Sequence, residues 1–285
     1  MTALLDEVAA ILGRRGIANA PIEADRIVRA AKASVSADYE GAARAMAERR
    51  AAGAPLAYVI GREVFMGVEL IAAEGALVPR EETELLGNAA LDALRAFDCA
   101  APRVIDMCCG SGNLACAIAR HLPGARVWGS DLTDGCIALT RRNIEHVGVA
   151  DRVVVAQGDL FAGLAGLGLD NSIDAVVCNP PYISQNKLAS DSAALLEHEP
   201  REAFAGGTFG ISIQQRVVKE ALSYLRPGGV LLFEIGLGQE RQVKTLFERA
   251  KAYEDIRLVA NTAGEVRVVS GRKRADDAAR MTVER

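Results

Sequence analysis

Apolar residues recur at helical spacing through the N-terminal part of the chain. One predicted helix face carries Leu4, Leu5, Val8, Ile11 and Leu12. A second helix is predicted after Pro21, and a third over residues 39–51, where Gly53 and Pro55 end it. Residues 1–62 are therefore expected to form a small helical domain.

The pattern changes to short extended pieces between residues 57 and 78. Alternating apolar and polar positions over residues 63–70 predict a hairpin with its turn near Gly67. We expect residues 63–80, which contain this hairpin, to link the helical domain to a second domain. A helix is predicted over residues 82–97, with Thr83 and neighbouring acidic residues near its start.

From residue 103 onward, strand-like apolar runs alternate with helical patterns. The predicted strands cover residues 104–107, 126–130, 153–157, 173–178 and 229–234, and the predicted helices cover residues 114–121, 133–147, 214–225 and 239–250. This alternation predicts an α/β fold with a doubly wound, mostly parallel sheet. Two later runs, 255–259 and 265–270, predict an antiparallel hairpin at the sheet edge. The second domain is expected to cover residues 81–274, and residues 275–285 a frayed tail.

Composition excludes some classes of protein. Hydrophobic residues make up 50% of the chain and charged residues 25%, as in soluble globular proteins. A net charge of −4 argues against a protein that mainly grips nucleic acid. No apolar run is long enough to span a bilayer, and acidic residues replace the positive start of a secretory signal, so a cytoplasmic protein without a membrane partner is expected. The six cysteines lack paired spacing and are expected to be reduced core residues rather than metal ligands.

Three successive strand ends carry residues suited to a nucleoside-containing cofactor. The first strand runs into a loop with two glycines, over residues 106–113, where a ligand can lie against the backbone. Asp131 can accept hydrogen bonds from both hydroxyls of a ribose, while Asp159 can receive an adenine amino group and Leu160 can cover the ring. The candidate cofactor residues are Asp106, Cys108, Gly110, Gly112, Asn113, Asp131, Leu132, Asp159, Leu160 and Asn179.

A nicotinamide dinucleotide is the competing ligand for this loop. Cys108 stands where the first glycine of the dinucleotide fingerprint would be, so the full fingerprint is missing. The two glycines alone are also compatible with a tight strand–helix connection that binds nothing. Three acidic residues in register favour a cofactor, and we expect S-adenosylmethionine.

The fourth strand ends in Asn-Pro-Pro-Tyr, residues 179–182, at the sheet edge where ligands bind. An amide or aromatic amine nitrogen is a poor nucleophile because its lone pair is delocalised. The Asn179 side-chain oxygen and the Pro180 carbonyl can hold its two hydrogens, while Pro180 and Pro181 stiffen the backbone and Tyr182 can stack on the planar group. The tetrapeptide predicts methyl transfer to such a nitrogen by positioning. A proline-rich turn without catalytic function is the alternative.

Further segments, together with this tetrapeptide, resemble the protein-(glutamine-N5) methyltransferases that modify the Gly-Gly-Gln motif of peptide chain release factors. They are residues 50–61, 65–67, 77–84, 199–207 and 234–239. The resemblance implies a Rossmann-like class I methyltransferase fold, S-adenosylmethionine as cofactor, and a release factor bound through the N-terminal helices. It also implies that Asn179 and Pro180 hold the glutamine carboxamide. The same resemblance implies supporting roles in the site for Arg80, Thr83, Glu84 and Glu199.

The sequence departs from this family pattern in three places. Cys108 and Cys109 replace a usual Gly-Thr pair, Met66 stands where an aromatic residue is frequent, and the helical region from residue 30 to residue 50 is short. Three other functions stay open: the same chemistry on a small molecule or another peptide, methylation of a nucleic-acid base, and cofactor binding without catalysis. The acidic net charge and the lack of an appended nucleic-acid-binding module argue against methylation of a nucleic-acid base.

Overall fold

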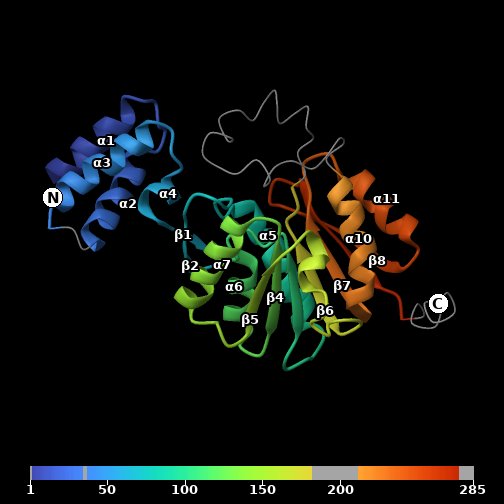
Figure 1. Ribbon diagram of the computed structural model, residues 1–285. Helices are drawn as coiled ribbons and strands as arrows, with labels where there is room; N and C mark the ends of the chain where they lie inside the picture. The colour runs from blue at the N-terminus through green and yellow to red at the C-terminus, as the bar shows by residue number, and fades with distance from the viewer. Residues whose placement is uncertain (1, 35–36, 182–210, 276–285) are drawn as a thin grey trace. The chain divides into compact units, whose positions relative to one another are not determined.

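The computed structural model describes residues 2–34, 37–181 and 211–275 (Figure 1). Contacts divide the chain into two compact units. The first comprises Met1–Glu63 with Ile71–Glu74, and the second comprises Val64–Leu70 with Gly75–Arg285. The tail expected over residues 275–285 lies outside the described residues except for Ala275.

The first unit is helical. Its helices are α1 (Thr2–Gly13), α2 (Ala20–Ala33), α3 (Tyr39–Ala51) and α4 (Leu56–Ile60). The apolar stripe of α1 packs on α2 and α3 around a core that includes Val8, Leu12 and Ile27. Asp38 caps α3 by accepting a hydrogen bond from the Gly41 amide at 2.8 Å.

Helix α4 corrects the prediction of extended structure from residue 57. Pro55 precedes the helix, and Gly61 ends it with a φ of 76°. Ala57 and Val59 are buried within this short turn of helix. Burial in the tertiary structure therefore outweighs the strand preference of the β-branched and aromatic residues in this segment.

The predicted hairpin is present as β1 (Arg62–Phe65) and β2 (Val68–Ile71). Met66 and Gly67 form its turn, with φ values of 49° and 75°. Both residues are left-handed, which is the geometry of a type I′ turn. The turn therefore lies where the sequence predicted it.

The second unit contains a seven-stranded sheet in the order β5-β4-β3-β6-β7-β9-β8. The strands are β3 (Arg103–Met107), β4 (Arg126–Asp131), β5 (Val153–Gln157), β6 (Ile173–Cys178), β7 (Leu225–Glu234), β8 (Tyr253–Ala260) and β9 (Val266–Lys273). Strands β3 to β7 are parallel, whereas β9 pairs antiparallel with both β7 and β8. The predicted α/β fold with a C-terminal antiparallel hairpin is confirmed.

Helices cover both faces of this sheet (Figure 1). They are α5 (Glu81–Arg95), α6 (Asn113–His121), α7 (Asp134–Val147), α10 (Ser212–Tyr224) and α11 (Glu240–Ala250), with a 3₁₀ turn η1 (Leu160–Leu164). Val104 packs with α5, α6 and α7, while its neighbour Ile105 packs with η1, α10 and α11. Alternate strand residues thus enter two separate cores.

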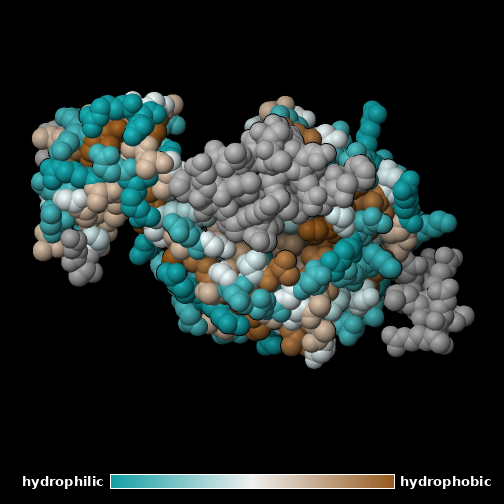
Figure 2. Space-filling model, turned by 45° about the horizontal axis from the view of Figure 1, so that its top comes forward, coloured by the Kyte–Doolittle hydropathy of each residue, from teal (hydrophilic) through white to brown (hydrophobic). Residues whose placement is uncertain are grey.

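Large apolar side chains that stay exposed among the described residues belong to separate elements and loops. They are Ile22, Val64, Leu132, Val154, Leu167, Leu237 and Leu258. The surface drawn in Figure 2 is correspondingly hydrophilic over wide areas, with apolar residues between them.

Candidate active site

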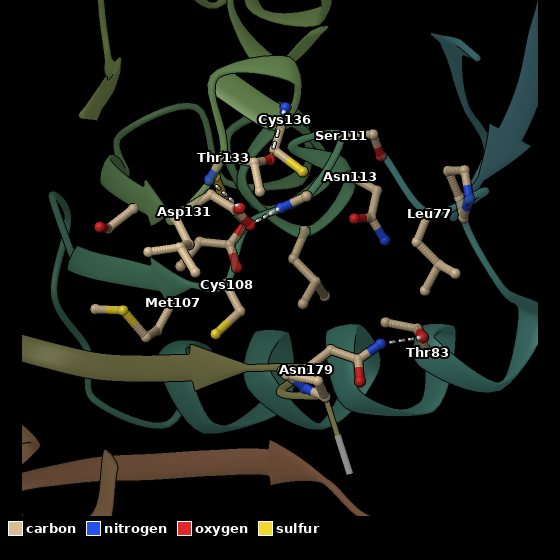
Figure 3. Close-up of a pocket in the computed structure, with 18 of the residues that line it drawn as sticks. Leu77, Thr83, Met107, Cys108, Ser111, Asn113, Asp131, Thr133, Cys136 and Asn179 are labelled. Carbon is tan, nitrogen blue, oxygen red and sulfur yellow. Dashed lines mark hydrogen bonds between the residues drawn. The ribbon is translucent and has the colours of Figure 1, made fainter. Parts of the chain in front are cut away.

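A cavity of about 260 Å³ lies at the carboxyl ends of β3, β4 and β6 (Figure 3). Parallel register sets Met107 beside Ser130 on one side and beside Cys178 on the other, so the loops after these strands meet. The predicted cofactor residues that line the cavity are Asp106, Cys108, Gly110, Asn113, Asp131, Leu132, Asp159, Leu160 and Asn179.

The loop from β3 to α6 forms one wall of the cavity. Cys108, Gly110 and Gly112 have φ values of 60°, 56° and 77°, a left-handed conformation that favours glycine. A Cβ on Gly112 would lie 2.5 Å from a methyl carbon of Thr140, so this glycine permits close packing on α7. Gly112 is not part of the cavity lining, whereas a Cβ on Gly110 would meet open space.

Backbone amides of this loop bind other protein groups. The Cys109 amide donates to the Ser130 carbonyl at 3.1 Å, and the Gly112 amide donates to the Cys109 carbonyl at 2.7 Å. The Gly110 amide donates to a carboxylate oxygen of Asp131 at 2.9 Å. A pyrophosphate needs such amides as free donors, so the geometry supports the prediction against a dinucleotide.

Asp106 is a buried acid in the cavity wall, with 1% of its surface exposed. Its Oδ2 accepts a hydrogen bond from the Ala115 amide at 2.9 Å. Among the described residues, neither its Oδ1 nor the buried hydroxyl of Ser111 has a partner. Burial raises the pKa of Asp106 to about 7, the Ala115 amide opposes this rise, and the nearby charge of Asp131 adds to it.

Asp131 lies at the end of β4, as predicted. Its second oxygen accepts a hydrogen bond from the Thr133 amide at 3.2 Å. A carboxylate oxygen can accept more than one hydrogen bond, so this anchored group can still receive ribose hydroxyls. Through the hydrogen bond from the Gly110 amide, Asp131 also holds the loop between β3 and α6 in place.

Asp159 has an ionic partner that the sequence did not reveal. Arg216 of α10 donates to both of its carboxylate oxygens at 3.0 Å. Leu160 is buried and has a φ of 51°, and its carbonyl accepts a hydrogen bond from the Ser130 hydroxyl at 2.8 Å. The role of Asp159 toward an adenine amino group stays a prediction.

Asn179 follows β6 directly and lines the cavity. Its side-chain amide donates a hydrogen bond to the Thr83 hydroxyl at 3.1 Å, drawn as a dashed line in Figure 3. Pro181 lines the cavity, whereas Pro180 is buried and does not. Tyr182 lies outside the described residues.

The residues with predicted supporting roles differ in their positions. Arg80 and Thr83 line the cavity. Glu84 does not, and its carboxylate instead accepts a hydrogen bond from the Met66 amide at 2.6 Å. Glu199 lies outside the described residues.

Several cavity residues were absent from the sequence-based set. They include Leu77, Val78, Pro79, Ser111, Thr133, Cys136 and Ile213. The first three belong to the segment 77–84 that resembles the family, and they could have been inferred from it. Ile213 comes from the first turn of α10, and no local pattern in the sequence indicates that this turn reaches the cavity.

The cavity fits S-adenosylmethionine. Its described lining includes three acidic residues, Asp106, Asp131 and Asp159. A sulfonium, an ammonium group and ribose hydroxyls suit the acceptor oxygens of such a lining. Two buried oxygens without partners in the described chain, on Asp106 and Ser111, remain for polar groups of a ligand.

Comparisons with known proteins agree with this geometry. Residues 87–211 match the Methyltransferase small domain. The chain is 34% identical over 281 residues to the release factor glutamine methyltransferase of Geobacter sulfurreducens, covering 94% of this chain and 95% of that protein. The protein of the same name from Gloeobacter violaceus is 36% identical over 215 residues, covering 75% of this chain and 73% of that protein.

Two solved structures share the fold. One is a 16S rRNA N2 G1207 methyltransferase from T. thermophilus in complex with AdoMet and guanosine, with a TM-score of 0.53, 20% identity, and coverage of 75% of this chain and 50% of that chain. The other is the N-terminal domain of human METTL16 in complex with SAH, with a TM-score of 0.52, 14% identity, and coverage of 72% and 76%.

The fold, the cavity and these relatives thus define a class I, Rossmann-like methyltransferase that uses S-adenosylmethionine and methylates nitrogen. Within this class, the chain belongs to the family of release factor glutamine methyltransferases. The family resemblance, the enzyme class and the cofactor predicted from the sequence are confirmed. Across the described residues, no helix is both long and apolar enough to cross a bilayer.

Proposed function

We propose that the enzyme methylates the side-chain amide nitrogen of a glutamine, in the Gly-Gly-Gln motif of a peptide chain release factor. The observation that carries this proposal is the asparagine at the end of β6, whose carboxamide lines the cofactor cavity. The names of relatives that cover most of the chain favour a protein glutamine over a small molecule or a nucleic-acid base. Since release factors act on ribosomes, we propose that the enzyme works in the cytoplasm.

The chemistry requires that a weakly nucleophilic amide nitrogen be held in one orientation. When bound, S-adenosylmethionine supplies an activated methyl group. The Asn179 oxygen and the Pro180 carbonyl would each accept one hydrogen of the substrate amide, which orients its nitrogen for in-line attack. The ring of Pro181 restricts the backbone next to that carbonyl. Tyr182 would stack on the planar amide.

Other residues would bind the cofactor or the protein substrate. Asp131 would hold the ribose hydroxyls, Asp106 the ammonium group, and Leu160 one face of the adenine ring. Arg80 and Thr83 line the same cavity and would support the substrate side of the site. The helices of residues 1–62 would recognise the release factor outside its glutamine.

The test of this mechanism is Asn179→Ala in single-turnover assays with whole release factor and labelled cofactor. We expect the rate to fall by about 10²- to 10³-fold, because one preorganised acceptor at the reacting group is lost. Cofactor affinity, measured by calorimetry, should fall only modestly. A variant that keeps more than about a tenth of the wild-type rate would contradict the proposed role of Asn179.

Asn179→Asp is the matched control. It keeps an acceptor of similar shape but adds a negative charge near the cationic cofactor, which favours the ground state more than the transition state. We therefore expect cofactor binding at least as tight as in the wild type and a slow but measurable methyl transfer.

A further inference from the structure

A continuous chain of polar contacts connects Asn179 to the C-terminal hairpin. The Asn179 amide donates to the Thr83 hydroxyl at 3.1 Å, and this hydroxyl donates to Oε2 of Glu234 at 2.7 Å. The other oxygen of Glu234 lies 3.5 Å from the guanidinium of Arg267. The four residues come from the end of β6, the first turn of α5, the end of β7 and the start of β9.

The fold holds Thr83 and Glu234 in place. Both side chains are buried, each with 1% of its surface exposed. Cys178 and Phe233 are partners in the parallel pairing of β6 and β7, so the next residues, Asn179 and Glu234, lie at the ends of neighbouring strands. Thr83 lies in the first turn of α5 and contacts both of them.

The single proton of the Thr83 hydroxyl gives this chain a direction. A carboxylate only accepts hydrogen bonds, so the hydroxyl proton must go to Glu234. The hydroxyl oxygen can then only accept, and its donor must be the NH₂ group of Asn179. In the described chain no donor occupies the Asn179 oxygen, which remains for a substrate.

The opposite orientation of the carboxamide would prevent catalysis. It would direct the NH₂ group of Asn179 at the substrate amide, whose own NH₂ also consists of donors. Two sets of donors cannot bond, and the nitrogen of the substrate would not be held. The proposed chemistry therefore needs a contact that selects one of the two orientations of the Asn179 carboxamide.

We propose that Thr83 and Glu234 are positioning residues that fix the orientation of the Asn179 carboxamide, so that its oxygen faces the methyl-accepting amide. The inference rests on the proposed function, because both residues act only through Asn179. The relevant property of Thr83 is its hydroxyl and not its size.

The experiment compares Thr83→Val, which keeps the shape and removes the hydroxyl, with Thr83→Ser, which keeps the hydroxyl. With whole release factor, Thr83→Val should lower kcat on the order of 10- to 100-fold, the range expected for a misplaced reacting group. Thr83→Ser should stay within about threefold of the wild type. The cofactor Kd should change less than about threefold in both variants, because the orientation of the Asn179 carboxamide acts on the substrate amide and not on the cofactor. Equal kcat values for the two variants would overturn the inference.

A double-mutant cycle separates positioning from general structural damage. Adding Thr83→Val to Asn179→Ala should not lower the methyl-transfer rate further, because Thr83 then has no carboxamide to orient. Additive losses would show that Thr83 does not act through Asn179. If Asn179→Ala alone keeps its rate, the proposed function fails, whereas a loss there with an active Thr83→Val enzyme refutes only the positioning role.

Glu234→Gln provides an independent test if Thr83→Val does not fold. A glutamine can donate as well as accept, so the hydroxyl of Thr83 is no longer forced to point at residue 234. Both orientations of Asn179 then become populated, and kcat should fall by about two- to tenfold in proportion to the competent fraction. A fully active Glu234→Gln enzyme would contradict the proposal.

Discussion

Asp106 shows how one buried side chain links stability to cofactor binding. Burial raises its pKa to about 7, while an unfolded chain would bind the proton with a pKa of about 3.9. Between these pH values the Asp106 carboxyl is protonated in a larger fraction of folded molecules than of unfolded molecules. The free energy of unfolding contributed by this group therefore falls as the pH rises through that window.

We predict that Asp106→Asn stabilises the ligand-free enzyme at pH 8 by roughly 1–3 kcal/mol, because it removes a buried charge. At pH 5 the gain should shrink, since the native carboxyl is then mostly protonated. Thermal unfolding at both pH values, with and without cofactor, measures this. The same variant should bind S-adenosylmethionine more weakly, and an equal stability change at both pH values would be inconsistent with this account.

At the scale of elements, the loop after β3 combines a strained residue with the cofactor wall. Cys108 has a φ of 60° and lines the cavity, at a position where the resembling family usually has glycine. A left-handed conformation costs a residue with a Cβ about 1–2 kcal/mol. The loop thus carries this cost where its backbone must turn toward α6.

We predict that Cys108→Gly is more stable than Cys108→Ala by about 1 kcal/mol, measured by urea unfolding. Both variants remove the thiol, but only alanine keeps the Cβ, so their difference reports the backbone strain less the larger conformational entropy of glycine in the unfolded chain. Cofactor affinity should be similar in the two. A more stable alanine variant would indicate that the loop relaxes away from the left-handed conformation.

Elements of the second unit were largely predictable because their patterns are local. The strands at residues 153–157 and 173–178 begin and end as predicted. Strand β7 begins earlier than predicted, because Leu225 pairs with Ile173 across an irregularity despite the turn-like Pro227-Gly228 pair. Pairing with a neighbouring strand therefore outweighs a local turn signal.

The candidate site was predictable only where a residue's own strand sets its position. Asp131 and Asn179 end their strands and line the cavity, as expected. Contacts between distant segments leave no local pattern in the sequence. Thr83 and Glu234, for example, are 151 residues apart in the chain. The pairing of Asp159 with Arg216 also depends on how α10 packs, which the sequence pattern does not specify.

At the scale of the whole molecule, the helical unit has its own core and its own ion pairs. Arg50 contacts Glu23 at 2.6 Å, and Arg44 contacts Glu7 at 2.9 Å, joining α3 to α2 and α1. The described cofactor cavity draws its lining only from residue 77 onward. This division of residues supports separate roles for the two units.

We predict that deletion of residues 1–52 abolishes methylation of whole release factor but leaves cofactor affinity within about threefold of the wild type, because the cavity residues remain. Calorimetry and whole-protein mass spectrometry measure the two properties. A short Gly-Gly-Gln peptide is the control, and the truncated enzyme should methylate it at a rate close to that of the full chain. Equal turnover of whole factor by both enzymes would refute the recognition role, and circular dichroism must first confirm that the truncated chain is folded.

The long separation along the chain between the cavity and Arg267 sets an order of events during synthesis. All described cavity residues lie between Leu77 and Ile213, so they are made before Arg267, one of the partners of Glu234. At ~5–20 residues per second, Arg267 follows Ile213 by roughly 3 to 11 s. Within that interval β7 is completed before β9, so the outer edge of β7 is transiently unpaired. A newly made chain therefore contains all the described cavity residues before the antiparallel hairpin can cover the edge of β7 and bring Arg267 to Glu234.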